Sequence, residues 1–135
     1  VSPRHFLRYL ISLLRPVENI GVKHYADNRN TEIISLDKAQ SGDVIILLET
    51  GAKNNLNHIL LITEKNNSIL KYAHARAWDS EGRYGHGVSY GEIQIVNQKG
   101  SLLDQQWLEQ GLVGEKNETF IEAKQAKILE MRRLK

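Results

Sequence analysis

The sequence contains no cysteine among its 135 residues. This absence excludes a disulfide framework, a thiolate zinc site, an iron–sulfur cluster and a cysteine nucleophile within the printed residues. The longest unbroken apolar run spans only residues 44–48, whereas a membrane-spanning helix needs roughly 20 such residues. We therefore expect no membrane span. The two prolines and ten glycines also exclude a collagen-like chain.

The chain lacks a strong excess of charge of either sign. Lysine and arginine number 18 and aspartate and glutamate 16, which gives a formal charge of +2. The basic residues are enriched in residues 1–29 and 122–135 around an acidic middle. Such a pattern does not form the broad basic surface of a nucleic-acid binding protein, so we expect no nucleic-acid partner. The composition predicts one globular domain over residues 1–135, and the initial valine suggests a chain trimmed at its N-terminus.

The hydrophobic pattern predicts a helix followed by strands. Ser2 and Pro3 suit the start of a helix, and apolar residues then recur at helical spacing through residues 2–14. Apolar runs bounded by turn residues predict four strands, at residues 44–48, 58–63, 69–73 and 88–96. Gly91 interrupts the last run and indicates a bulge or a close backbone approach. A helix packed on an antiparallel meander sheet predicts an α+β fold.

Other segments give weaker patterns. Residues 17–43 are expected to form an irregular connection, because much of this stretch has little apolar content. After Gly100, a short helix that ends at Gly111 is predicted, with Leu102, Leu103, Gln106 and Trp107 on one side. The tail permits two predictions, a helix lined by apolar residues of 119–135 or a closing strand over residues 128–134.

Two of the five histidines fall at the ends of predicted strands. A three-residue loop at 65–67 pairs Glu64 with Ser68 and places His58 directly opposite His74. Side chains that face each other in this way have Cβ atoms within about 5.5 Å, so we predict an imidazole nitrogen of His58 within hydrogen-bond reach of His74, directly or through one water. One ring then serves as a general base and the other orients it. Alternatively, each histidine ends a strand and hydrogen-bonds a loop carbonyl, and a one-residue register shift separates them.

The order of these segments resembles the NlpC-type branch of the papain-like cysteine peptidases. The matching segments are the Gly42-Asp43 turn, His58 with the apolar residues 59–62, the Tyr-Ala-His-Ala sequence at residues 72–75, and the strand after them. The resemblance covers about residues 1–96. It implies a papain-like α+β core, His58 as the general base and His74 as the third catalytic position. It also implies cleavage of an amide bond in a peptide or peptidoglycan-like substrate, in a bacterial envelope or secreted setting.

The chain departs from this family at the nucleophile. The family places a cysteine at the N-terminus of the first helix, where the helix field stabilises a thiolate. Here Pro3 stands near that position and Ser2 is the nearest hydroxyl. The cysteine lies upstream of Val1, or it has been replaced, or the domain is a catalytically inactive binding or regulatory module on the same fold.

A loop with aromatic and basic residues follows the second histidine. We predict that Arg76, Trp78, Tyr84 and His86 line a substrate cleft, since such loops beside a catalytic pair commonly set specificity. Alternatively, the aromatic residues pack over a sheet edge. A zinc site of His58, His74 and His86 lacks close ligand spacing, and no glycine-rich phosphate loop is present, so we expect no metal and no cofactor. The sequence makes no prediction of oligomeric state.

Overall fold

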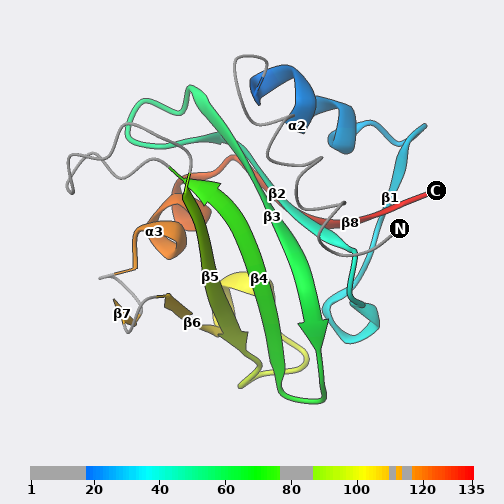
Figure 1. Cartoon of the computed structure of the whole chain (residues 1–135), viewed down its shortest axis with the longest axis vertical. Helices are drawn as coiled ribbons and strands as arrows, with labels where there is room; N and C mark the ends of the chain where they lie inside the picture. Colours follow the sequence, from blue (N-terminus) through cyan, green and yellow to red (C-terminus); the bar gives the residue numbers. More distant parts are fainter. Residues whose placement is uncertain (1–17, 77–86, 110–111, 114–116) are drawn as a thin grey trace.

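The computed structural model describes residues 18–76, 87–109, 112–113 and 117–135. These residues form one eight-stranded sheet in the order β1-β8-β2-β3-β4-β5-β6-β7 (Figure 1), and all neighbouring strands are antiparallel. The strands are β1 (Thr31–Ile33), β2 (Val44–Thr50), β3 (Leu56–Lys65), β4 (Ile69–Arg76), β5 (Gly87–Gln94), β6 (Gln106–Glu109), β7 (Leu112–Val113) and β8 (Ile128–Leu134). The helical elements are α2 (Glu18–Ala26), α3 (Glu118–Gln125) and the 3-10 turns η1 (Leu36–Lys38) and η3 (Leu102–Asp104).

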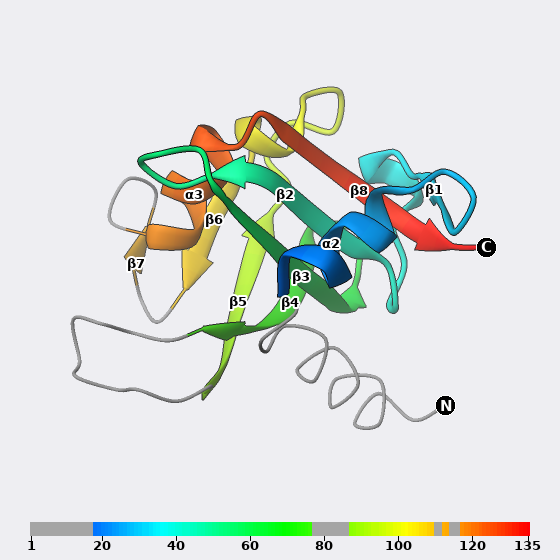
Figure 2. The same ribbon diagram turned by 90° about the horizontal axis from the view of Figure 1, so that it is seen from above.

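The centre of the sheet is buried on both faces. Successive side chains of a strand point to opposite faces, so the apolar run of β2 contributes to two cores. The main core lies on the α3 side and consists of Ala39, Ile45, Leu47, Leu60, Ile62, Leu70, Tyr72, Ile93, Trp107, Ala123 and Met131. The second core lies under α2, which runs alongside β2 and β3 (Figure 2), and consists of Val22, Tyr25, Val44, Ile46, Ile59, Leu61 and Ala75.

The predicted α+β, papain-like fold is wrong, because the described residues form a β-rich structure dominated by the antiparallel sheet. The two described α-helices are only nine and eight residues long. The predicted helix at residues 2–14 lies outside the described residues. The sheet extends into segments that the sequence pattern did not mark as strands, namely β1, β6 and β7.

The segment after Gly100 differs from its predicted helix. It forms the single 3-10 turn η3, followed by the strand β6. In β6 the Trp107 ring is fully buried, 6.0 Å from the Tyr72 ring between centroids. Its Nε1 donates to the carbonyl of Leu102 at 2.9 Å. The tryptophan therefore enters the main core from a strand, with alternate residues of that strand facing inward.

The segment at residues 128–134 forms a strand, β8, next to the edge strand β1 of the sheet. Ile128–Leu134 pairs with β2 on one side and with β1 on the other, which agrees with the closing-strand alternative. Arg133 binds Asp43 of the Gly42-Asp43 turn, with Nε 2.8 Å from Oδ1. Arg132 donates to the side chains of Glu130 and Asn28. The contacts with Asp43 and Asn28 attach β8 to other segments of the chain, whereas the Arg132–Glu130 pair lies within β8.

No helix in the parts of the chain that the structure describes combines the length and the apolar character required to cross a membrane.

Candidate functional site

The β3–β4 hairpin brings the two histidines to one face, although in a different register from the predicted one. The structure pairs Ile62 with Tyr72, whereas the prediction paired Ile62 with Leu70. The hairpin loop is longer than expected, because Lys65 pairs with Leu70 and residues 66–69 lie between these paired positions. Within this stretch, Asn66 accepts hydrogen bonds from the backbone of Ser68 and Ile69. A bulge between Ile62 and Glu64 then shifts the strand pairing back by one residue toward the predicted register. The net shift is two residues, so the predicted face is retained.

His58 and His74 are therefore diagonal neighbours and contact each other directly. Nε2 of His58 lies 2.8 Å from Nδ1 of His74. The ring centroids are 5.0 Å apart and the ring planes are inclined at 81°. Diagonal positions on adjacent strands are within reach of aromatic side chains. The prediction that an imidazole nitrogen of His58 lies within hydrogen-bond reach of His74 is confirmed, and the prediction that the residues stand directly opposite is wrong.

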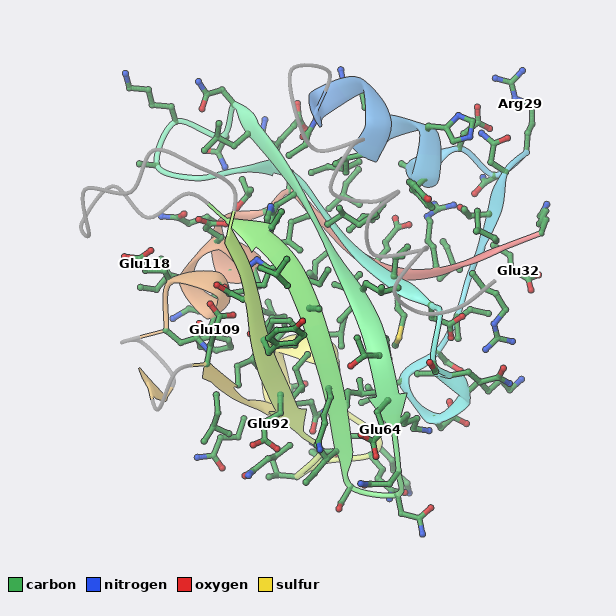
Figure 3. The ribbon with its side chains drawn as sticks, viewed as in Figure 1. Arg29, Glu32, Glu64, Glu92, Glu109 and Glu118 are labelled. Carbon is green, nitrogen blue, oxygen red and sulfur yellow. The ribbon has the colours of Figure 1, made fainter. Side chains whose placement is uncertain are left out.

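A buried carboxylate continues this contact on the far side of His74. Glu109 of β6 accepts a hydrogen bond at Oε1 from Nε2 of His74 at 3.0 Å. The side chains of His74 and Glu109 are 0% and 3% exposed. Figure 3 shows Glu109 beside α3 and β5. His58, His74 and Glu109 thus form a continuous hydrogen-bonded row across one face of the sheet, which we call the His–His–Glu row.

Two hydroxyl groups hold the carboxylate of Glu109. The Tyr72 hydroxyl donates to Oε1 at 2.6 Å, and the Thr119 hydroxyl of α3 donates to the same oxygen at 2.9 Å. The first turn of α3 is itself fixed by Asn117, whose Oδ1 accepts from the backbone N–H of Thr119 and of Phe120. Helix capping and strand pairing together place these donors around one oxygen.

Gly91 makes the Tyr72 contact possible. Gly91 of β5 pairs with Tyr72 on one side and with Glu109 on the other. A Cβ atom at Gly91 would lie 2.4 Å from both Cζ and Oη of Tyr72, well inside van der Waals contact. The phenol ring therefore crosses β5 over the position where any other residue has a side chain. This is the close approach that the glycine indicated in the sequence.

The environment of Glu109 keeps its carboxyl group ionised. Burial raises the pKa of Glu109, but the hydrogen bond and charge of His74, with the hydroxyls of Tyr72 and Thr119, more than offset burial, so the pKa lies below its usual value. Burial, followed by the negative charge of Glu109, raises the pKa of Tyr72 far above its usual range. Tyr72 therefore stays protonated and acts as a donor.

The remaining predicted site residues are not brought to the row by any described contact. Arg76 ends β4, where its backbone pairs with Gly87, and its side chain is not among those described. Trp78, Tyr84 and His86 lie outside the described residues, as do Ser2 and Pro3. Within the described ranges, no group of three His, Asp or Glu side chains is arranged so that it could hold a metal ion.

Glu109 is the functional candidate that sequence reasoning missed. Alternate residues of this segment are buried, namely Gln105, Trp107 and Glu109. Two of these three are polar, so the strand shows no apolar alternation. The available signal was a glutamate two residues from a tryptophan, which is too common to indicate a buried carboxylate.

The row has the groups that proton transfer requires. An imidazole is its outer member, a second imidazole is its middle member and an ionised carboxylate is its inner member, and each is linked to the next by a hydrogen bond. Such an arrangement suits general base catalysis, in which the outer ring exchanges a proton and the inner groups orient it. No protein-family model, curated protein or solved structure matches this chain.

Proposed function

We propose that this chain is a hydrolase-type domain that cleaves an amide bond in a peptide or peptidoglycan-like substrate. His58 is the general base and His74 is its orienting partner. The observation that supports the proposal is the 2.8 Å contact between Nε2 of His58 and Nδ1 of His74. The resemblance of the segments around these residues to NlpC-type peptidases supports the same substrate class. It concerns those local segments alone.

The proposed reaction begins at the ring nitrogen of His58 that does not face His74. That nitrogen takes the proton of a thiol, and the sulfur attacks the amide carbonyl carbon while the C=O π pair moves to oxygen. When the tetrahedral intermediate collapses, the C–N bond breaks and His58 returns the proton to the leaving amine. Water then gives a proton to His58, its oxygen bonds to the acyl carbon, and the thiol regains its proton as it leaves.

The thiol is not among the 135 printed residues, so this scheme requires one from the rest of the reading frame. The same absence favours a second candidate, a non-catalytic binding or regulatory module that retains the His–His–Glu row for structural reasons. A cysteine encoded within a few residues before Val1 favours the enzyme. A reading frame without one favours the module.

The proposal is tested with the protein expressed from its complete reading frame. Peptidoglycan fragments and short peptides are incubated with it, and mass spectrometry detects products that have gained one water. His58→Ala is expected to lower the rate by about 100-fold or more, the usual contribution of a general base. His24→Ala is the matched control, because the exposed His24 ring contacts Asn30 and belongs to α2.

Circular dichroism at the assay temperature verifies that both variants are folded. Retention of activity by folded His58→Ala contradicts the role of His58 as the base. A wild-type protein that binds these substrates and releases no product supports the binding module instead.

A further inference from the structure

The carboxylate of Glu109 is an unusually well-defined acceptor. Its Oε1 atom accepts three hydrogen bonds, from the Tyr72 hydroxyl at 2.6 Å, the Thr119 hydroxyl at 2.9 Å and Nε2 of His74 at 3.0 Å. Three donors that converge on one oxygen favour the anion, because each hydrogen bond is strengthened by the negative charge. The side chain is 3% exposed, so these donors take the place of water.

This acceptor determines where the protons of both imidazoles lie. A carboxylate only accepts, so Nε2 of His74 carries a proton. In the neutral ring, the lone pair of His74 is then on Nδ1, which faces Nε2 of His58 at 2.8 Å. Nε2 of His58 must therefore donate, and the lone pair of His58 lies on its Nδ1 atom. The negative charge of Glu109 therefore decides which atom donates in both hydrogen bonds of the row: His58 donates to His74, and His74 donates to Glu109.

We propose that Glu109 is a positioning residue that orients the two-histidine base from the far end of the row and stabilises the positive charge it acquires. The inference rests on the proposed function, in which His58 takes up a proton. When Nδ1 of His58 receives that proton, its Nε2 proton can pass to Nδ1 of His74. The positive charge then lies directly beside the carboxylate.

The alternative role of Glu109 is structural, since a buried carboxylate also satisfies the donors around it. Glu109→Gln separates the two roles because it retains the shape and one oxygen acceptor but removes the charge. A structural role predicts a change in stability alone. A positioning role predicts a change in the proton affinity of the histidines, since an opposite charge within a few ångströms favours the protonated ring.

The experiment is ¹⁵N-detected NMR of the imidazole rings in the complete protein, as a function of pH. In the wild type, both His58 and His74 are expected to carry their proton on Nε2 at neutral pH. In Glu109→Gln, the midpoint of the His58 titration is expected to fall by about one pH unit, in the direction of easier deprotonation. His24→Ala supplies the assignment control without altering the row.

Either of two results overturns the inference. One is a wild-type His58 ring protonated on Nδ1 at neutral pH, which reverses the direction of the row and needs no variant. The other is an unchanged His58 midpoint in folded Glu109→Gln. Because this readout does not require turnover, the expected tautomers in a protein without hydrolase activity support the orienting role and refute the proposed function. Hydrolysis by the wild type, together with an unchanged His58 midpoint in Glu109→Gln, supports the proposed function and refutes the orienting role of Glu109.

Discussion

Removal of the Tyr72 hydroxyl tests the buried half of the His–His–Glu row. Tyr72→Phe deletes the 2.6 Å hydrogen bond to Oε1 of Glu109 and retains the ring that packs against Trp107. A hydrogen bond to a charged group contributes about 1.5–3 kcal/mol, so the free energy of unfolding is expected to fall by that amount at pH 7. Tyr90→Phe makes the same chemical change on a residue that is 62% exposed, and it is expected to cost less than about 0.5 kcal/mol.

The cost of Tyr72→Phe is also expected to depend on pH. The pKa of Glu109 lies below its usual value in the folded protein, so the stability from its ionised form is fully present above about pH 4.3. It is lost as the pH falls through the lower folded-state pKa. The difference between Tyr72→Phe and the wild type should shrink in that window, as measured by urea unfolding followed by circular dichroism. Equal costs for the two tyrosine variants at pH 7 would refute this account of the Tyr72–Glu109 contact.

Two further predictions concern the elements that place these groups. Gly91→Ala is expected to cost about 1–3 kcal/mol, as an over-packed core does, because its Cβ would lie 2.4 Å from the Tyr72 ring. In a Tyr72→Ala background, thermal unfolding should show a smaller cost. An unchanged cost would assign the effect to the backbone carbonyl of Leu108, which would lie 2.9 Å from the added Cβ. Asn117→Ala is expected to cost about 1 kcal/mol in urea unfolding, since two backbone N–H groups of α3 lose their acceptor. A loss below a few tenths of a kcal/mol would contradict the capping role.

The contact between His58 and His74 was predictable because both residues occupy one face, and a register shift of two residues still leaves them diagonal neighbours. Face follows from a period of two, so it survives any even change in register. The register itself depends on the Asn66 loop and on the bulge after Ile62. The local sequence around the loop and the bulge does not specify how many residues each inserts between paired positions.

Glu109 and the fold class were not predictable for a different reason. A strand is recognised when apolar residues alternate with polar ones, and β6 buries a glutamate beside its tryptophan. The edge strand β1 has only three residues, fewer than a pattern requires. Partners distant in the sequence, and not local preference, make these segments strands.

The position of β8 affects the order in which the sheet can assemble. It is the last of the described strands, yet it joins β1 to β2 and pairs Leu134 with Thr31. A nascent chain that emerges from its N-terminal side can pair β2, β3, β4 and β5 early, whereas β1 must wait for β8. Closing such a long loop costs chain entropy before any contact compensates for it. Refolding is therefore expected to have a late, rate-limiting phase in which β8 docks between β1 and β2.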